Sequence, residues 1–250
     1  MRSLTALITG AGGGMCRGIN RRLAEAGHTV VCVDLDAERS EAAAEAVRAV
    51  GGKAHAFAAD VTKPEDLSRL HREVLERVGT VQAIVNAAGV LDRKMLLDHD
   101  AESFAKVLGI NLVGPFAVIR EFAQDMLDAD FGRIVNISSI AGTTGYPYPS
   151  YAASKAGLSN LTRSLLMDLW GTGITVNSVC PGVVDTQMVI QSVRDQVKNK
   201  VPTGRIVEPE EIGALVAFLL SDDARSINGA DLLIDGGATQ IFRLFDPQQA

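Results

Sequence analysis

The sequence predicts an α/β fold built on one doubly wound parallel sheet of about seven strands, with helices on both faces. Short runs rich in Val and Ile alternate with longer segments of helical period, which is the pattern of βαβ units. These runs are apolar along almost their whole length, as expected for strands that helices cover on both faces. A chain of 250 residues with 47% hydrophobic content can bury one sizeable core, so we expect residues 1–250 to form a single domain.

Seven segments are predicted strands, and most of the segments between them are predicted helices. The strands are expected at Leu4–Thr9, Thr29–Asp34, Lys53–Asp60, Val81–Asn86, Gly132–Ser138, Ile174–Cys180 and Asp231–Ile234. The helices are expected at Ala37–Val50, Pro64–Val78, Ala101–Asp128, Ser150–Trp170 and Pro209–Leu220. Asp36 is placed to cap the first of these helices, and Thr62 with Glu65 has the spacing of a capping box before the second.

The composition argues against several classes of function. A net charge of −6 without a basic cluster disfavours a nucleic-acid partner, because phosphates require grouped Lys and Arg. The longest apolar run, Ala214–Leu220, is far shorter than the ~20 residues that span a bilayer, so no membrane partner is expected. Cys16, Cys32 and Cys180 are odd in number and widely spaced, which favours free thiols and a cytoplasmic location. The histidines show no metal-ligand spacing, so no metal is expected.

A glycine-rich turn follows the first predicted strand. It reads Thr9-Gly10-Ala11-Gly12-Gly13-Gly14-Met15-Cys16-Arg17-Gly18 and leads into a segment of helical period. Glycine lets the backbone turn tightly and approach a pyrophosphate, whose charge is met by N–H groups at a helix N-terminus. The pattern therefore indicates a Rossmann-like dinucleotide site. The alternative is a flexible turn without a ligand.

Asp34 ends the second predicted strand, 20 residues after Gly14. A carboxylate at this point can accept hydrogen bonds from both hydroxyls of a ribose, and it repels a 2′-phosphate. The sequence therefore favours NAD over NADP as the cofactor. The alternative is that Asp34 is only a turn residue beside Asp36.

Tyr151 and Lys155 are separated by four residues in a segment of helical period, so both side chains lie on one face of the predicted helix. A phenol has an unperturbed pKa near 10, and a neighbouring ammonium is expected to lower the pKa of Tyr151 towards neutral pH. Such a tyrosine can exchange a proton with a substrate. The alternative is a packed tyrosine beside a solvated lysine.

Four further motifs follow the glycine turn in order along the chain. They are Asn86-Ala87-Ala88-Gly89, Asn111-Leu112-Val113-Gly114, Asn136-Ile137-Ser138-Ser139-Ile140-Ala141-Gly142, and Cys180-Pro181-Gly182 followed by Thr186. With these five ordered motifs, the chain resembles the short-chain dehydrogenase/reductase family over residues 3–238. The glycine motif of that family matches Thr9, Gly10 and Gly14.

The resemblance implies an oxidoreductase that transfers a hydride between NAD and a secondary alcohol or ketone. The implied general acid/base is Tyr151, and Lys155 lowers its pKa and holds the nicotinamide ribose. The resemblance further implies that Ser139 hydrogen-bonds the substrate oxygen and that Asn111 holds a water linking Lys155 to solvent. The implied cofactor-binding residues are Thr9, Gly10, Gly14, Met15, Asp34, Asp60, Val61, Asn86, Gly89, Tyr151, Lys155, Pro181, Gly182, Val184 and Thr186. For Asp60 the alternative is a turn carboxylate near a helix start.

Three positions depart from the family pattern. Cys16 stands where a third glycine is usual; we expect it to be accommodated by a shifted helix, and a redox role of its thiol is the alternative. Ala87 replaces an asparagine, for which we expect a minor effect. Ser139 lies 12 residues before Tyr151, one fewer than is usual, so Ser138 is the alternative catalytic hydroxyl.

The substrate and the assembly are the least determined features. Residues 183–208 lack a clear period and are expected to form a substrate lid. Residues 239–250 are expected to form a C-terminal tail that packs on a neighbouring copy, in the homotetramer that the resemblance implies. An NADP-dependent 3-oxoacyl-thioester reductase is an alternative function. A nucleotide-sensing module without turnover and a methyltransferase are further alternatives, which would not require the four implied catalytic residues together.

Overall fold

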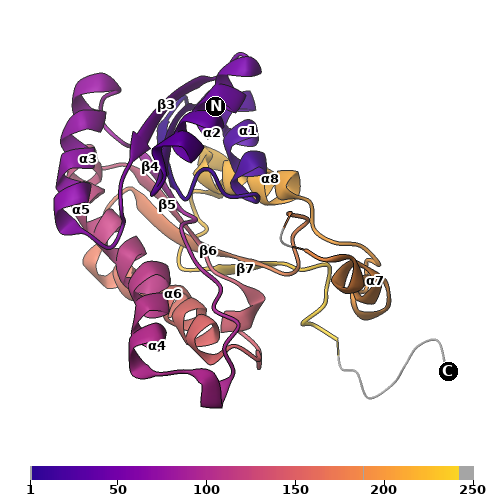
Figure 1. Cartoon of the computed structure of the whole chain (residues 1–250). Coiled ribbons are helices and arrows are strands. Elements are labelled where there is room, and N and C mark those ends of the chain that lie inside the picture. Colours follow the sequence, from indigo (N-terminus) through magenta and orange to yellow (C-terminus); the bar gives the residue numbers. More distant parts are fainter. Residues whose placement is uncertain (1, 188, 242–250) are drawn as a thin grey trace.

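The structure, a computed structural model, describes residues 2–187 and 189–241. Its centre is a parallel sheet of seven strands in the order β3-β2-β1-β4-β5-β6-β7 (Figure 1). The strands are β1 Thr5–Thr9, β2 Thr29–Asp34, β3 Lys53–Ala58, β4 Ala83–Asn86, β5 Gly132–Ile137, β6 Ile174–Pro181 and β7 Asp231–Ile234. Of the predicted tail 239–250, residues 242–250 lie outside the described part of the chain.

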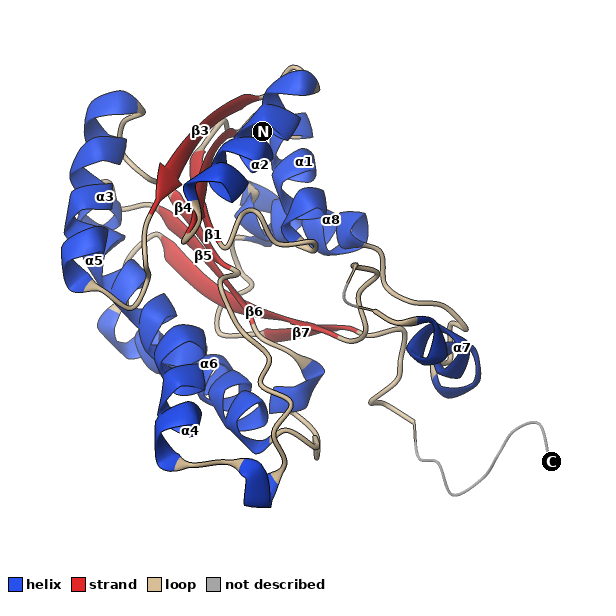
Figure 2. Ribbon diagram, in the orientation of Figure 1, coloured by secondary structure: helices blue, strands red, loops and turns tan. Residues whose placement is uncertain are grey.

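Helices cover both faces of the sheet (Figure 2). On one face lie α1 Cys16–Glu25, α2 Ala37–Ala49 and α8 Pro209–Leu220. On the other face lie α3 Pro64–Arg77, α4 Ala101–Leu108, α5 Gly114–Asp128 and α6 Pro149–Asp168, while α7 Gln191–Lys200 lies beyond the ends of β6 and β7. Each face has its own buried core, with Ile19 and Ile212 in the first and Phe122 and Ile134 in the second. The predicted fold class is therefore confirmed.

Some local predictions are wrong. The helix expected over Ala101–Asp128 is interrupted by a π-helical turn, Gly109–Val113, between α4 and α5. The segment without a clear period contains α7. Thr62 does not cap α3: the N-cap is Lys63, and Thr62 instead donates from its N and Oγ1 to Asp60 Oδ1. Asp36 caps α2 as predicted.

One helical stretch has the length and composition of a membrane span, Ala101–Asp128. In the fold, its second half packs on the sheet, with Val118, Phe122 and Met126 fully buried. The core helix of a water-soluble protein has the same length and hydropathy. The stretch is therefore a core helix of this fold, and no membrane span is shown.

Helices α1 and α8 approach each other at two glycines. A Cβ on Gly18 would lie 2.1 Å from the backbone C and O of Pro209, and a Cβ on Gly213 would lie 2.3 Å from Gly18 O. These distances are impossible for real atoms, so both positions require glycine for this packing. Cys16 is buried two residues before Gly18, at the start of α1.

Gly18→Ala should lower the free energy of unfolding by about 1–3 kcal/mol, because the added methyl group meets backbone atoms that cannot move aside. Denaturant unfolding followed by circular dichroism measures this change. Gly145→Ala is the control, since a Cβ there meets nothing within 4 Å. Equal stabilities of the two variants would contradict the close packing of α1 on α8.

Candidate active site

The predicted site residues gather at one edge of the sheet. The carboxyl ends of β1, β4 and β5 lie side by side, since Thr9 pairs with Asn86 and Asn86 with Asn136. β6 continues this row, with Val179 opposite Ile137. The strand order reverses between β1 and β4, and ligands of open α/β sheets bind in the crevice outside such a point.

The glycine turn packs against the turn after β4 and is hydrogen-bonded to it. Gly10 has a φ of +66°, and a Cβ on it would lie 2.8 Å from Ala88 Cα, so a side chain is excluded there. Thr9 Oγ1 accepts hydrogen bonds from the N–H groups of Ala87 and Ala88, each at 3.2 Å. Met15 is the N-cap of α1 and makes no side-chain cap bond. Bare backbone therefore faces the crevice at the start of α1.

Asp34 faces the glycine turn from the end of β2. Its side chain is 6% exposed, and Oδ2 accepts a hydrogen bond from Gly12 N at 3.0 Å. Oδ1 accepts from Asp36 N at 3.3 Å, so Asp34 also stabilises its own turn. Arg39, which the sequence analysis did not single out, places Nη2 at 3.8 Å from Asp34 Oδ2. The carboxylate thus lies where a ribose ligand is expected, with one exposed cation beside it.

The structure contradicts a redox role for Cys16. The thiol is buried, and burial raises the pKa of Cys16 to about 12, with Asp34 adding to the effect. Thiolate is the reactive form, so a thiol with this pKa is inert at neutral pH. Cys16 is a packing residue.

Asn86 gives an independent sign that a polar ligand fits the crevice. Its Nδ2 donates to Asn136 Oδ1 at 2.9 Å, whereas its Oδ1 is buried without a hydrogen-bond partner among the described residues. Buried polar atoms without partners are rare in folded proteins. The unpaired oxygen of Asn86, the backbone of the glycine turn and the carboxylate of Asp34 together suit the dinucleotide that the resemblance implies.

Asp60 and Val61 lie beside the turn that follows β3. Asp60 Oδ1 accepts from Thr62 N at 2.9 Å and from Thr62 Oγ1 at 2.6 Å, and these bonds lower the pKa of Asp60. Val61 is buried against the start of α5, where it restricts Gly114. Asp60 therefore acts as a turn carboxylate in this structure, and its proximity to an adenine stays a prediction.

Tyr151 and Lys155 lie on one face of α6, with Lys155 Nζ 5.8 Å from the centroid of the Tyr151 ring. Lys155 is 6% exposed, and its Nζ donates to Ile137 O at 2.7 Å. Burial lowers the pKa of Lys155 to about 8. Burial also raises the pKa of Tyr151, which a hydrogen bond with Ser139 offsets in part. The expected lowering of the tyrosine pKa by Lys155 is thus not found here, since burial raises the pKa of Tyr151 and the offset comes from Ser139.

Ser138 and Ser139 have different partners. Ser138 Oγ donates to Lys155 O at 2.9 Å and accepts from Ser159 Oγ at 3.0 Å, so its hydroxyl holds α6 on β5. Ser139 Oγ accepts from Ala141 N at 3.1 Å, and its hydroxyl lies close enough to the Tyr151 phenol to lower the pKa of Tyr151. Of the two hydroxyls, Ser139 is the one that shares the site with Tyr151.

Asn111 lies in the π-helical turn and is fully buried. Its Oδ1 accepts from Val90 N at 2.8 Å, and its Nδ2 donates to Val90 O at 2.9 Å and to Ser154 Oγ at 3.0 Å. Ser154 Oγ in turn donates to Tyr151 O at 2.7 Å, a role that the spacing of three residues could have suggested. The side chain of Asn111 therefore fixes backbone around the site. The water that it is expected to hold stays a prediction.

Gly89 lies where Asn111 and Lys155 meet. A Cβ on Gly89 would lie 3.2 Å from Asn111 Oδ1 and 3.6 Å from Lys155 Nζ. Any side chain at this position would occupy the space beside the ammonium group. The structure thus brings Gly89, Asn111 and Lys155 together, as the motifs predict.

The segment after β6 returns to the glycine turn. Pro181 is buried at the end of β6, and a Cβ on Gly182 would lie 2.9 Å from Asp235 Cβ. Val184 forms an isolated parallel bridge with Val207, which ties the two ends of the predicted lid together. Thr186 lies over the glycine turn, since a Cβ on Gly14 would be 3.2 Å from Thr186 Cβ.

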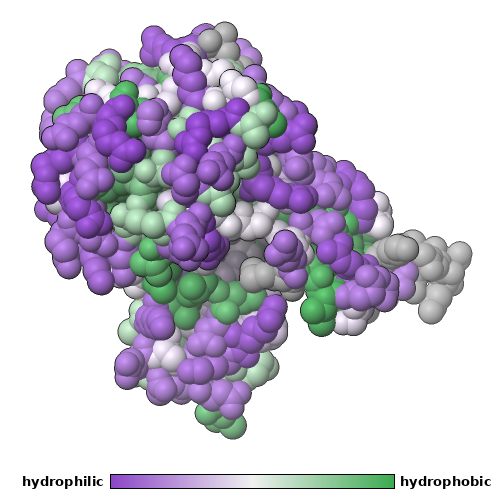
Figure 3. Space-filling model, turned by 45° about the horizontal axis from the view of Figure 1, so that its top comes forward, coloured by the Kyte–Doolittle hydropathy of each residue, from purple (hydrophilic) through white to green (hydrophobic). Residues whose placement is uncertain are grey.

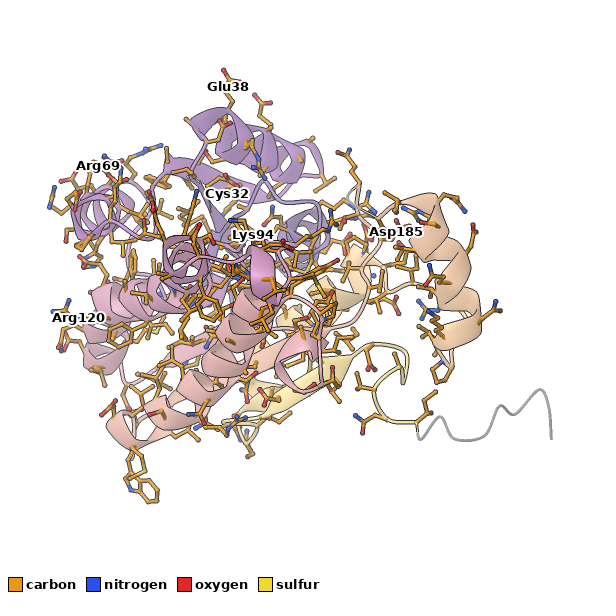
Figure 4. The ribbon with its side chains drawn as sticks, turned by 60° about the horizontal axis from the view of Figure 1, so that its bottom comes forward. Cys32, Glu38, Arg69, Lys94, Arg120 and Asp185 are labelled. Carbon is orange, nitrogen blue, oxygen red and sulfur yellow. The ribbon has the colours of Figure 1, made fainter. Side chains whose placement is uncertain are left out.

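An exposed ion pair attaches α7 to this segment. Arg194 Nη2 lies 2.5 Å from Asp185 Oδ1, and Asp185 is seen beside α7 in Figure 4. Both side chains are about one-third exposed. A pair of this kind is weak, so α7 is held less firmly than the strands below it.

The chain matches proteins of known family along almost its whole length. The family model described as enoyl-(acyl carrier protein) reductase matches residues 10–239. Acetoacetyl-CoA reductase of Allochromatium vinosum is 37% identical, with 93% of this chain and 97% of that protein covered. Meso-2,3-butanediol dehydrogenase of Serratia marcescens is 36% identical, with 93% of both covered. The crystal structure of an actinorhodin polyketide ketoreductase variant with NADPH superposes with a TM-score of 0.91, at 32% identity and 96% and 98% coverage.

These matches confirm the resemblance drawn from the motifs. The protein is an oxidoreductase of the α/β class with a nicotinamide-dependent chemistry. It belongs to the short-chain dehydrogenase/reductase family.

Lys155→Met should raise the free energy of unfolding of the cofactor-free protein by about 2 kcal/mol at pH 7. The pKa of Lys155 falls from 10.5 to about 8 on folding, which costs about 3 kcal/mol at neutral pH, and the lost bond to Ile137 O returns about 1 kcal/mol. Between pH 8 and 10.5 the unfolded chain binds the extra proton, so the wild type gains stability as pH rises and the difference shrinks.

Urea unfolding at pH values across this window measures the difference between the two proteins. Lys106→Met, on the exposed part of α4, is the control and should change stability little at any pH. A Lys155→Met variant that is less stable than wild type at pH 7 would show that the buried ammonium is compensated.

Proposed function

We propose that the protein interconverts 3-oxoacyl and 3-hydroxyacyl thioesters, with a nicotinamide cofactor as the hydride carrier. The observation that carries this proposal is the convergence of Ser139, Tyr151 and Lys155 outside the carboxyl ends of β4, β5 and β6. The matched family model refers to acyl carrier protein, and acetoacetyl-CoA reductase is a similar relative. The alternative drawn from the sequence, a 3-oxoacyl-thioester reductase, is thus better supported than a general secondary alcohol dehydrogenase.

A small secondary alcohol or ketone is the second candidate substrate. Meso-2,3-butanediol dehydrogenase matches at nearly the same identity as acetoacetyl-CoA reductase, and the same three side chains serve either substrate. The two candidate substrates differ in the groups attached to the reacting carbonyl, so turnover assays with each of them distinguish the two functions.

In carbonyl reduction Tyr151 would act as the general acid. Its phenol is protonated at neutral pH, and burial raises its pKa further. Ser139 and Tyr151 hold the substrate oxygen, and Tyr151 gives it a proton as the carbonyl carbon is reduced. The cofactor supplies the hydride. Lys155, with a pKa of about 8, is mostly protonated at pH 7 and stabilises the phenolate that forms.

Asp34 supports NAD(H) as the cofactor. The buried carboxylate faces the glycine turn, where a 2′-phosphate would meet its charge. The rival is NADPH, which the similar polyketide ketoreductase carries in its crystal structure. Arg39 is the cation next to Asp34 that a 2′-phosphate would use.

Exposed apolar side chains support an assembly of several copies. Val113 and Phe116, at the start of α5, are 55% and 44% exposed, and Trp170 after α6 is 81% exposed. Large apolar side chains left exposed on helices are common at interfaces. We therefore keep the homotetramer as a proposal. The three free, buried cysteines suit the proposed cytoplasmic location.

Wild-type protein should reduce acetoacetyl-CoA and longer 3-oxoacyl thioesters, and Tyr151→Phe should lose at least about 10³-fold in kcat while it still binds the cofactor. The absorbance of the reduced nicotinamide measures turnover, and fluorescence titration measures binding. Tyr148→Phe, at the N-cap of α6, is the control and should keep its activity. Turnover of 2,3-butanediol or small ketones without thioester turnover would favour the second candidate. Full activity of Tyr151→Phe would exclude the mechanism.

Asp34→Ser should reduce the ratio of NAD to NADP catalytic efficiency at least about tenfold, because the charge that opposes a 2′-phosphate is removed. Asp36→Ser is the matched control, since Asp36 caps α2 two residues further on and should affect stability rather than cofactor choice. A wild type that prefers NADPH, or an unchanged ratio in Asp34→Ser, would contradict the assignment of NAD.

A further inference from the structure

His99 contacts the helix that carries Tyr151, although it lies outside every motif of the family. Its Nε2 shares a hydrogen bond with Ser150 Oγ at 3.1 Å, and its Nδ1 shares one with Ser103 Oγ at 3.3 Å. The ring also makes an edge contact with Phe104, with centroids 5.7 Å apart. Both ring nitrogens and one ring edge are thus engaged, so the orientation of His99 is fixed by α4 on one side and α6 on the other.

The first turn of α6 has no N-cap side chain that hydrogen-bonds its free N–H groups. Its N-cap, Tyr148, makes no side-chain cap hydrogen bond, and Pro149 follows directly. The first N–H groups of a helix have no intrahelical partner, so an uncapped first turn tends to fray. Ser150 is fully buried in this turn, and its hydroxyl is bonded to His99. The His99 contact therefore stabilises the first turn where a cap is missing.

Ser150 directly precedes Tyr151, so movement of the first turn would move the phenol. The residues after Tyr151 are already held, because Asn111 bonds Ser154 Oγ and Ser138 Oγ bonds Lys155 O. Before Tyr151, the hydrogen bond from Ser150 to His99 is the corresponding attachment.

The segment of residues 90–99 is attached to α6 at both ends. At its start, Asn111 bonds both the N–H and the C=O of Val90 and also bonds Ser154. At its end, His99 bonds Ser150. Between these points, Leu96 and Leu97 are 77% and 95% exposed. Lys94 of the same segment lies near the centre of the view in Figure 4, and hydrophobic side chains gather across the middle of the face seen in Figure 3.

We propose that His99 is a positioning residue, which fixes the first turn of α6 through Ser150 and thereby sets the position of Tyr151 relative to the segment of residues 90–99. The expected loss of kcat rests on the proposed function. The expected loosening of the first turn of α6 rests on the geometry alone. His99 touches no reacting atom.

The kinetic test compares substitutions of His99. His99→Ala should lower kcat about tenfold and change the KM of the cofactor much less, since most of the implied cofactor-binding residues lie on elements other than α6. His99→Gln should restore most of kcat, because its amide can reach Ser150 Oγ. Ser150→Ala should reproduce the loss, and the double variant should lose no more than either single one. Additive losses, or no rescue by glutamine, would overturn the proposal.

His71→Ala is the matched control. His71 is also a half-buried histidine between two helices, with Nε2 2.9 Å from Asp125 Oδ2, but it joins α3 to α5 away from Tyr151. It should lower stability and leave kcat unchanged. If His71→Ala and His99→Ala lose kcat equally, the effect of His99 is general destabilisation and the proposal fails.

Hydrogen exchange provides a readout that needs no substrate. In His99→Ala, amide exchange should accelerate about tenfold or more in peptides that cover residues 148–154, with the end of α6 unchanged. In His71→Ala, the acceleration should fall on α3 and α5. Unchanged exchange at the start of α6 would overturn the proposal. Absent turnover of wild type on every substrate, with the expected exchange pattern, would instead contradict the proposed function.

Discussion

The arrangement of the site depends on the burial of Lys155 between α6 and the ends of β5 and β6. Its ammonium is nearly excluded from water and is bonded to Ile137 O, at the last residue of β5. A buried ammonium is unfavourable unless its environment is polar and well ordered. The lowered pKa of Lys155 records that cost. The residues around it supply fixed hydrogen bonds where α6 meets β5 and β6.

That contact combines polar groups with the apolar packing of Leu158 and Leu165. Thr162 Oγ1 accepts from Asn136 Nδ2 at 2.9 Å and is bonded to Ser178 Oγ at 2.7 Å. Ser138 joins Lys155 O to Ser159 in the same way. Hydrogen bonds are directional, so a slide of α6 along the sheet would break several at once, whereas apolar side chains tolerate small shifts. The register of Tyr151 and Lys155 over the strand ends follows from this network.

Local patterns in the sequence account for the sheet, the glycine turn and the pairing of Tyr151 with Lys155. Alternating apolar runs and a spacing of four in a helix depend on neighbouring residues, and both predictions hold. Ser138 and Ser139 could not be separated in this way, because what distinguishes them is contact with Lys155 and Tyr151, far along the chain. The pKa of Tyr151 was expected to fall because the sequence shows the nearby lysine but not the burial that raises the pKa of the phenol.

Two further local features could not be predicted from neighbouring residues, because they depend on contacts with residues elsewhere in the fold. The π-helical turn at Gly109–Val113 places Asn111 where its amide meets Val90 and Ser154, and a helical period alone predicts an unbroken helix. Thr62 and Glu65 have capping spacing, yet Thr62 is engaged with Asp60. In each case a side chain had two possible partners, and the one chosen is set by the fold around it.

The buried residues around Lys155 are held more firmly than the exposed segments near them. Asn111, Ser138 and Lys155 are buried and bonded on several sides, so the reacting groups are held by the core itself. Leu96 and Leu97 are exposed in the segment of residues 90–99, and α7 is attached through an exposed ion pair. The segment joins the buried network at its ends, through Val90 and His99, so substitutions of Leu96 and Leu97 leave those hydrogen bonds in place. A family with this division can vary such exposed side chains while Tyr151 and Lys155 keep one geometry. Similar identity to an acetoacetyl-CoA reductase and to a butanediol dehydrogenase is what such a division would produce.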